Sequence, residues 1–360
     1  MRIKFVSKTP VDRLEALWSA FLPREGIGTH SFTFDPDDRD YDFLAVYEDL
    51  PPLPGERRVM RSERLACPPD HTVLFVTEPT SIRIDGLHYL SQYGRIATSR
   101  RFSDEDGQTL WDAQTFPSLP PVLVPFYGRD MDGDAHIHID TIADEMVDKP
   151  LGLSTVTSNK AMDHTVHAQR LDFVRALKAR MGDDLDLFGR GIEDIAMKRD
   201  AMRPYRYHLA IENHVQRGHF TEKLTDCFLA RCLPFYFGDP TASSVFPRQA
   251  MIPIDIFDID GAEATIRAAM AADEWSKRRN ALETAREITL DLANPLKAAA
   301  RFADSVATTR IADAKRRPRT IHGRHAFRRA HPVRAAQDAL YRARAQRSPL
   351  ANPLQDVRLV

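Results

Sequence analysis

The sequence lacks any apolar run approaching the ~18–20 residues that span a bilayer, which excludes a multispan membrane protein. Its N-terminus also lacks the apolar region of a signal peptide and predicts a first strand instead. Cysteine is scarce, with 3 residues among 360 (Cys67, Cys227 and Cys232). Three cysteines cannot all pair with one another, so we expect free or buried thiols and a reducing, cytoplasmic compartment.

The overall composition shows no excess of charge: 43% of the residues are hydrophobic, 28% are charged and the net charge is −1. These values are typical of globular proteins and exclude wholesale disorder, and the length suggests about two domains. The net charge conceals a split, because residues 315–350 hold eleven Lys or Arg and one acid, Asp338. That segment carries +10 and the remainder −11, so we expect an acidic body with a basic tail.

Short strand patterns alternate with amphipathic helical patterns along most of the chain. We predict strands at 2–7, 42–47, 72–77, 185–188, 205–211, 234–237 and 251–256, and helices at 11–22, 161–181, 222–232 and over most of 262–310. Such alternation is typical of parallel sheets with helices on both faces. Breaker residues crowd 117–152 and favour an interdomain connection. We therefore predict an α/β fold with domains at 1–150 and 151–312, followed by a basic tail at 313–360.

The densest polar signal follows the predicted strand 205–211. Glu212 and Asn213 come at its carboxyl end, and Thr221 is suited to cap the next helix. The free N–H groups of a helix start attract phosphate, and Lys223 in the first turn adds a full positive charge. Glu222 beside it could accept hydrogen bonds from two hydroxyls of a sugar. The pattern is compatible with a site that binds a nucleotide sugar. A neighbouring Glu-Lys pair at a helix start is, however, more often a solvated charge pair without a ligand.

The run YRYHLAIENHVQRGHFTEKLTDCFLARCLPFYFGDP at 205–240 resembles the C-terminal signature of glycosyltransferase family 10, the α-1,3/4-fucosyltransferases. That signature joins an aromatic–basic–aromatic strand ending in Glu-Asn to a Thr-Glu-Lys helix start. DLDLFGRG at 184–191 and FPRQAMIPIDIFD at 246–258 also resemble it, and FVTEP at 75–79 and VLVPFYG at 122–128 do so more weakly. The resemblance to a bacterial-type member implies the GT-B architecture: two Rossmann-like domains facing across a cleft, inverting chemistry and GDP-fucose as donor.

The same resemblance implies a donor site in the C-terminal domain. Arg190 and Lys223 match cations that face the donor phosphates, and Glu222 matches a carboxylate that binds ribose or sugar hydroxyls. Asn213 matches a polar residue near the donor. The remaining candidate donor-binding residues are Tyr205, Tyr207, Glu212 and His219. The two tyrosines could instead be core or wall residues. The histidine stands where a family member carries a tyrosine, which puts the identity of the sugar in question.

An inverting transfer needs one base that deprotonates the acceptor hydroxyl. Glu78 follows the predicted strand 72–77, at the rim where parallel sheets place functional side chains, and it matches the family's catalytic glutamate. Pro79 ends the strand beside it. Glu48, which follows the predicted strand 42–47, is the alternative base, and capping of the next turn is the alternative role of Glu78.

A metal-like spacing occurs within the predicted connection, at Asp130, Asp132, Asp134, His136, His138 and Asp140. Carboxylates and imidazoles in such a spacing could bind a divalent ion. We prefer an exposed acidic linker at this position, and therefore predict no metal site and no required cofactor, although a divalent metal could stimulate the enzyme. GT-B enzymes can neutralise the leaving diphosphate with Arg, Lys and a helix N-terminus.

The expected partners are a GDP-sugar donor, a glycan acceptor containing GlcNAc or galactose, and an anionic membrane surface facing 315–350. A solvated extension, or packing on the acidic body, are the alternatives for this basic segment. The leading function is an α-1,3-fucosyltransferase, cytoplasmic or peripheral on the inner face of the membrane. The alternatives are a family member that uses another GDP-sugar and, more distantly, a nucleic-acid-binding protein led by the basic tail. The sequence does not encode the acceptor, the linkage or the oligomeric state in any recognisable motif.

Overall fold

The structure is a computed structural model that describes residues 1–98, 124–130, 136–146, 148–157, 166–292, 294–308 and 319–347. The chain divides into two compact units. The first unit comprises Met1–Val122 and Asn294–Ala351, and the second comprises Leu123–Ala293 and Asn352–Val360.

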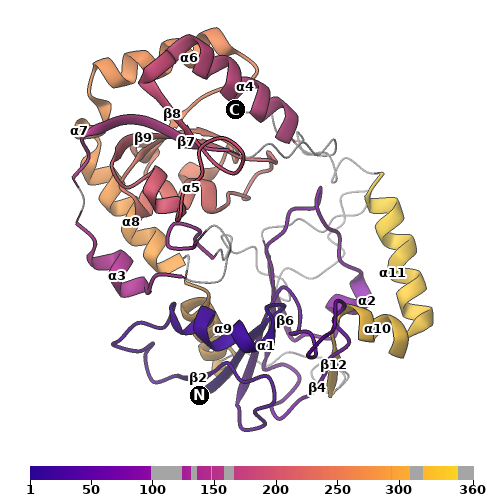
Figure 1. Ribbon diagram of the computed structural model, residues 1–360. Helices are drawn as coiled ribbons and strands as arrows, with labels where there is room; N and C mark the ends of the chain where they lie inside the picture. The colour runs from indigo at the N-terminus through magenta and orange to yellow at the C-terminus, as the bar shows by residue number, and fades with distance from the viewer. Residues whose placement is uncertain are drawn as a thin grey trace. The chain divides into compact units, whose positions relative to one another are not determined.

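The first unit is built on a five-stranded parallel sheet with strand order β2-β1-β3-β5-β6 (Figure 1). Its strands are β1 (Arg2–Ser7), β2 (Ser31–Thr33), β3 (Phe43–Tyr47), β5 (Thr72–Val76) and β6 (Arg95–Thr98). The inner strands β3 and β5 are mostly apolar and almost wholly buried, as expected for a sheet covered on both faces.

Helices α1 (Val11–Ser19) and α9 (Pro295–Thr308) cover one face of this sheet. The ring of Trp18 in α1 meets Phe5 of β1 edge-on, with ring centroids 4.7 Å apart. The ring of Phe302 in α9 meets Phe75 of β5 in the same manner at 5.9 Å. The apolar stripe of α9 therefore joins the first unit, although the sequence pattern predicted it as part of the second domain.

The C-terminal segment covers the opposite face of the first sheet. It contains β12 (Thr320–His322), α10 (Arg324–Ala330) and α11 (Pro332–Ala345), and β12 pairs antiparallel with β4 (Ser62–Arg64). Ile321 and Phe327 are buried in one cluster with Leu44 and Leu74 of the sheet. Helix α2 (Leu87–Leu90) packs between this segment and the sheet and contacts α11 (Figure 1).

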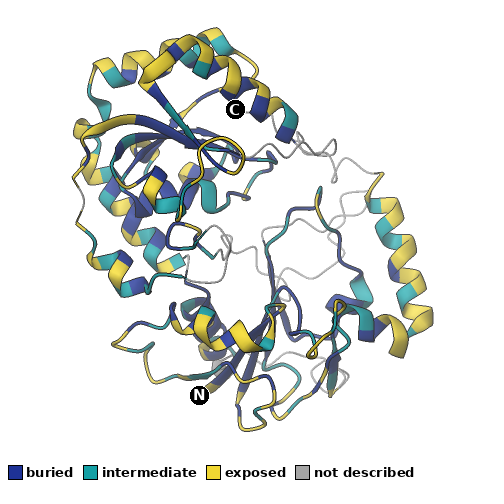
Figure 2. Cartoon of the chain, viewed as in Figure 1, coloured by how far each residue is buried: buried dark blue, intermediate teal, exposed yellow. Residues whose placement is uncertain are grey.

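Within the predicted basic tail at 313–360, residues 319–347 pack on the first unit, which agrees with the alternative prediction that this segment packs on the body of the protein. The reason is the two large apolar side chains, Ile321 and Phe327, which the high arginine content concealed. Each exposes 2% of its surface or less. Figure 2 shows that the remaining faces of α11 are largely exposed.

The second unit contains another five-stranded parallel sheet, with strand order β11-β10-β9-β7-β8. Its strands are β7 (Leu151–Val156), β8 (Leu185–Phe188), β9 (Tyr205–Ile211), β10 (Leu233–Phe237) and β11 (Ile252–Pro253). Helices α4 (His167–Met181) and α6 (Ile259–Ala271) contact each other, as do α5 (Glu222–Leu229) and α8 (Arg279–Leu292) (Figure 1). The shorter elements are α3 (Ile139–Asp144), α7 (Glu274–Lys277), and the 3₁₀ turns η1 (Gly182–Asp184), η2 (Lys198–Ala201), η3 (Ala242–Ser244) and η4 (Arg248–Ala250).

Both units thus have the doubly wound, Rossmann-like architecture that the sequence predicts, and the predicted α/β fold class is confirmed. The predicted domain boundaries differ from this division, in which Asn294–Ala351 belongs to the first unit. Strand β7 begins within the segment that the sequence pattern assigned to a connection.

Candidate functional site

The carboxyl ends of β7, β8 and β9 meet at one edge of the second sheet, where α/β proteins bind ligands. The amide of Thr157, just beyond β7, donates a hydrogen bond to the carbonyl of Phe188 at 2.9 Å. Gly189 then turns the chain with φ +129°, and a Cβ there would lie only 1.8 Å from the carbonyl oxygen of Thr157. Only glycine permits this approach, which fixes the turn that carries Arg190.

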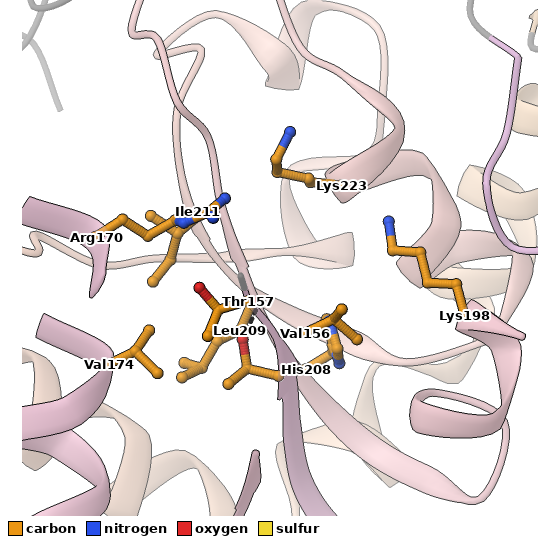
Figure 3. A pocket seen from close by; sticks show the side chains of 10 residues that line it. Val156, Thr157, Arg170, Val174, Lys198, His208, Leu209, Ile211 and Lys223 are labelled. Atoms are coloured by element: carbon orange, nitrogen blue, oxygen red, sulfur yellow. Dashed lines mark hydrogen bonds between the residues drawn. The ribbon is translucent and has the colours of Figure 1, made fainter. Parts of the chain in front are cut away.

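Three cationic side chains line a pocket at this edge (Figure 3). Arg170 comes from α4, Lys198 from η2 and Lys223 from the first turn of α5. The other lining residues are Thr155, Val156, Thr157, Val174, His208, Leu209 and Ile211. The enclosed volume is about 20 Å³, room for about one water molecule. A ligand larger than this would lie over the opening of the pocket.

Several buried polar atoms at this edge have no hydrogen-bond partner among the described residues. They are Nε of Arg170, Oγ1 of Thr157 and Oδ1 of Asn213. Arg170 exposes 7% of its surface, and no ion pair to it is found within the part of the chain that the structure describes. Buried donors and acceptors left unpaired are costly, so the two such side chains that line the pocket, Arg170 and Thr157, point to a polar ligand there.

The start of α5 is organised by a buried carboxylate. Glu212, 1% exposed, accepts hydrogen bonds from the amide of Thr221 at 2.8 Å and from its hydroxyl at 2.6 Å. The Thr221 hydroxyl in turn accepts from the amide of Lys223 at 3.3 Å, which confirms the predicted N-cap. Glu212 therefore holds the helix start in place, and its carboxylate is occupied by protein groups.

Lys223 lies between two carboxylates. Its Nζ is 3.2 Å from Glu222 and 3.4 Å from Glu212. Burial lowers the pKa of Lys223, but these two acids outweigh burial and raise it. Burial raises the pKa of Glu222, yet Lys223 and Lys198 outweigh that effect and bring it to about 2. Both side chains are therefore charged at neutral pH.

Lys198 is paired with Asp226 of α5. Its Nζ lies 2.8 Å from Oδ2 of this fully buried aspartate, and the amide of Phe126 donates to Oδ1 at 3.1 Å. Burial raises the pKa of Asp226 to about 6, although Lys198 opposes the shift. His208 beside the pocket is kept neutral, because burial lowers its pKa to about 3.

The pocket can therefore receive an anionic group. Lys198 and Lys223 are each balanced by carboxylates of the same unit. Arg170 supplies the further positive charge, at the carboxyl edge of a parallel sheet and near the start of a helix. Planar, bidentate donors of this kind suit phosphate and carboxylate.

The structure brings some of the predicted donor-binding residues to this pocket and places others elsewhere. Lys223 lines it, and Asn213 leaves β9 at the same edge. Arg190 lies in the exposed turn after β8, at this edge but outside the pocket lining. His219 is 1% exposed and packs edge-on against His214, with ring centroids 5.7 Å apart.

Tyr205 and Tyr207 lie in the core of the second unit, 4% and 3% exposed. The Tyr205 hydroxyl donates to Asp186 at 2.8 Å. The Tyr207 hydroxyl donates to the carbonyl of Ala269 at 3.2 Å, and its ring stacks on Phe235. Neither tyrosine lines the pocket, which agrees with the alternative prediction that they are core residues.

The sequence did not single out Arg170 or Lys198. Arg170 belongs to a predicted helix, but its pattern gives no sign that this residue points to the sheet edge. Lys198 lies in a 3₁₀ turn with no recognisable motif. What they share is a position in the tertiary structure: the connections that follow β7 and β8 bring both residues to the edge of the second sheet where Lys223 lies.

The candidate base, Glu78, leaves β5 at the carboxyl edge of the first sheet and is half-buried. Glu48, the alternative base, is 2% exposed. Burial raises the pKa of Glu48, but Arg83 and Thr77 outweigh burial and bring it to about 2. A carboxylate so buried and so strongly stabilised as the anion is a poor base, which leaves Glu78 as the better candidate.

Part of the metal-like sequence cluster, including Asp132 and Asp134, lies outside the described residues. Of the described members, His136 is half-buried with Nε2 2.9 Å from the carbonyl oxygen of Pro125, and the ring of His138 accepts from the amide of Asp140. No group of three His, Cys, Asp or Glu placed to hold a metal occurs within the ranges that the structure describes.

Comparison with known proteins matches the second unit to a family. The model "Glycosyltransferase family 10 (fucosyltransferase) C-term" matches residues 148–273, which include the pocket and the start of α5. The protein is thus an enzyme of the glycosyltransferase class. Within that class, residues 148–273 match the model of family 10, the fucosyltransferase family, in agreement with the resemblance of the sequence motifs. No curated protein matches the chain.

Solved structures of glycosyltransferases share its general architecture at a distance. An α1,3-fucosyltransferase with GDP is 14% identical, with a TM-score of 0.48, 86% of this chain covered and 91% of that one. The HepE protein of Anabaena, in complex with UDP, is 9% identical, with a TM-score of 0.44, 86% of this chain covered and 100% of that one. No helix within the described ranges has the length and apolarity needed to cross a membrane.

Proposed function

We propose that the protein transfers fucose from GDP-fucose to a hydroxyl of a glycan containing GlcNAc or galactose, with inversion, and that the pocket of the second unit faces the donor diphosphate. The observation that carries the proposal is that the family 10 match falls on a pocket lined by three cations, one of which, Arg170, has a buried Nε without a partner. The α-1,3 linkage is the specific form of the proposal, and it rests on the overall resemblance to the α-1,3/4-fucosyltransferases, since no single motif encodes it.

The roles of the residues follow from their chemistry. Arg170, Lys198 and Lys223 stabilise the negative charge that develops on the departing diphosphate, without a required cofactor. Glu222 and Asn213 accept hydrogen bonds from sugar or ribose hydroxyls. Arg190, in the exposed turn, closes over the phosphates from the side. Glu78 of the first unit takes the proton of the acceptor hydroxyl as it attacks the anomeric carbon.

Replacing Arg170 tests the donor site. We expect Arg170→Gln to weaken GDP binding in a calorimetric titration by about tenfold or more, because a charged hydrogen bond to phosphate contributes about 1.5–3 kcal/mol. Arg175→Gln is the matched control, since Arg175 is an exposed arginine on the same helix. Equal affinities of the two variants for GDP would refute the assignment of the pocket.

The identity of the sugar needs a separate measurement. Thermal shifts and donor hydrolysis would be compared for GDP-fucose, GDP-mannose and UDP-sugars, followed by mass-spectrometric detection of transfer to a small glycan panel. The strongest response to another GDP-sugar would favour the alternative transferase of the same family. This alternative keeps the diphosphate site and changes only the sugar contacts around His219.

Helix α11 and its neighbours supply the surface for the proposed anionic membrane partner. Val333 and Leu340 are 72% and 55% exposed on α11, and Arg334 and Arg344 are exposed on the same helix. Exposed apolar side chains flanked by arginines are typical of interfacial helices. Sedimentation with vesicles that contain or lack anionic lipid, using Arg334→Glu/Arg344→Glu, tests this contact. Truncation is unsuitable because the segment is part of the first unit.

A further inference from the structure

The turn that carries Glu78 is closed by a buried carboxylate from the neighbouring strand. Oε1 of Glu48 accepts hydrogen bonds from the amide of Thr77 at 2.7 Å and from its hydroxyl at 2.5 Å. Oε2 of the same carboxylate lies 2.5 Å from a guanidinium nitrogen of Arg83. The amide of Arg83 also donates to the carbonyl of Pro79 at 2.9 Å. Glu48 thus ties together both ends of the segment 77–83.

Glu48 itself has a backbone conformation that needs support. Its φ is +72°, in the left-handed region that non-glycine residues rarely adopt. Such a conformation persists only where the surrounding structure determines it. Since Glu48 follows β3 and Thr77 follows the adjacent β5, this conformation is what turns the Glu48 side chain toward the Glu78 segment.

That support comes from Arg324, at the start of α10. Its guanidinium donates to the backbone carbonyl of Glu48 at 2.6 Å and to the carboxylate of Asp85 at 3.0 Å. Asp85 also lies 3.3 Å from Nε of Arg83. The contacts form a closed ring in which Arg324 reaches Glu48 directly and also through Asp85 and Arg83.

Arg324 is held firmly in this position. It is largely buried, its guanidinium lies 5.4 Å from the ring centre of Tyr89, and it is 3.5 Å from Asp49. Glu48 and Arg324 are separated by 276 positions in the chain. The C-terminal segment therefore contributes a charged group to the functional edge of the first sheet.

We propose that Arg324 and Glu48 are positioning residues for the glycosyl transfer: Arg324 holds the backbone of Glu48, and Glu48 holds the turn that presents Glu78 to the acceptor hydroxyl. This inference rests on the proposed role of Glu78 as the base. Neither positioning residue touches the substrate, so their loss affects the chemical step more than donor binding. A misplaced catalytic group costs rate even when the displacement is small.

The test is Arg324→Gln, with Arg324→Lys as a milder variant and Arg329→Gln as the control on an exposed arginine of the same helix. We expect Arg324→Gln to lower kcat for fucosyl transfer by about tenfold or more with the donor KM nearly unchanged. We also expect faster hydrogen exchange at the Thr77 amide, measured by mass spectrometry well below the melting temperature. Arg324→Lys keeps the positive charge but lacks the planar guanidinium that can bind two acceptors. Its kcat should therefore lie between those of the wild type and Arg324→Gln.

Two controls separate this inference from the proposed function. If Glu78→Gln abolishes transfer while Arg324→Gln retains both normal kcat and normal exchange at Thr77, the positioning role is overturned and the base assignment stands. If Glu78→Gln retains normal kcat, the proposed base is wrong and the positioning role is overturned with it. A decrease in kcat equal to that of Arg329→Gln would also overturn the inference.

Discussion

The ring of Phe327 lies edge-on to the ring of Tyr89, with centroids 5.9 Å apart, although nearly the whole second unit separates them in the chain. Tyr89 belongs to α2 and Phe327 to α10, and both pack against the apolar face of the first sheet. The contact makes the arginine-rich C-terminal segment a structural layer of the first unit.

Phe327→Ala tests this packing. We expect a loss of about 3–5 kcal/mol in the free energy of unfolding of the first unit, because a large buried ring leaves a cavity. The measurement is urea unfolding followed by hydrogen exchange of the β3 and β5 peptides, which report on the first unit alone. Val333→Ala, at a position 72% exposed on α11, should change stability by less than about 0.5 kcal/mol. Equal effects of the two substitutions on stability would contradict the interpretation that the C-terminal segment is a structural layer of the first unit.

Glu78→Gln tests the base. We expect transfer to fall by about 10²–10⁴-fold, since the amide cannot accept the acceptor proton. GDP affinity should remain within about twofold, because Glu78 lies in the first unit and the cations proposed to face the donor lie in the second. Glu25→Gln, an exposed glutamate of the same unit, is the control. Near-normal turnover of Glu78→Gln would reject the assignment.

The Lys198–Asp226 pair predicts a pH dependence of anion binding. The pKa of Asp226 is about 6, so the aspartate gains a proton as the pH falls from 7 to 5 and no longer neutralises Lys198. The pocket becomes more positive, and sulfate, whose charge is constant over this range, should bind about threefold to tenfold more tightly at pH 5. Titration calorimetry at both pH values measures this change.

Asp226→Asn isolates the effect. Glu222, with a pKa of about 2, and His208, with a pKa of about 3, keep their charge states across this range. Burial also raises the pKa of Glu212, which could add to the pH dependence. The difference between the wild type and Asp226→Asn therefore measures the contribution of Asp226 alone. The same pH dependence in both proteins would contradict the prediction.

The sequence predicted those elements whose pattern is local and strong. Strands β8 and β9 match the predicted bounds 185–188 and 205–211. Short runs of apolar or alternating residues between helices are compatible with few structures other than a strand. The N-cap at Thr221 and the role of Lys223 in a cationic pocket also follow from local spacing. The family resemblance at 205–240 lies within the matched residues 148–273.

The remainder depended on tertiary contacts that no local pattern records. The β4–β12 pair joins two strands of three residues each from distant parts of the chain. Arg170 and Lys198 reach the pocket only because the connections that follow β7 and β8 lie at the same edge of the second sheet. Glu48 had the right position for a base, but its partner Arg83, which makes it a structural anion, could not be inferred from the sequence.

The first unit is assembled from two separate stretches of the chain, Met1–Val122 and Asn294–Ala351, and Leu123–Ala293 of the second unit lies between them in the sequence. During synthesis the second unit can therefore complete its sheet before the first one does. The face of the first sheet that Ile321 and Phe327 cover stays exposed until residues beyond 327 have left the ribosome. Completion of the first unit thus requires synthesis to proceed past the second unit, and a chain that stops before residue 321 would carry a folded second unit and an uncovered face of the first sheet.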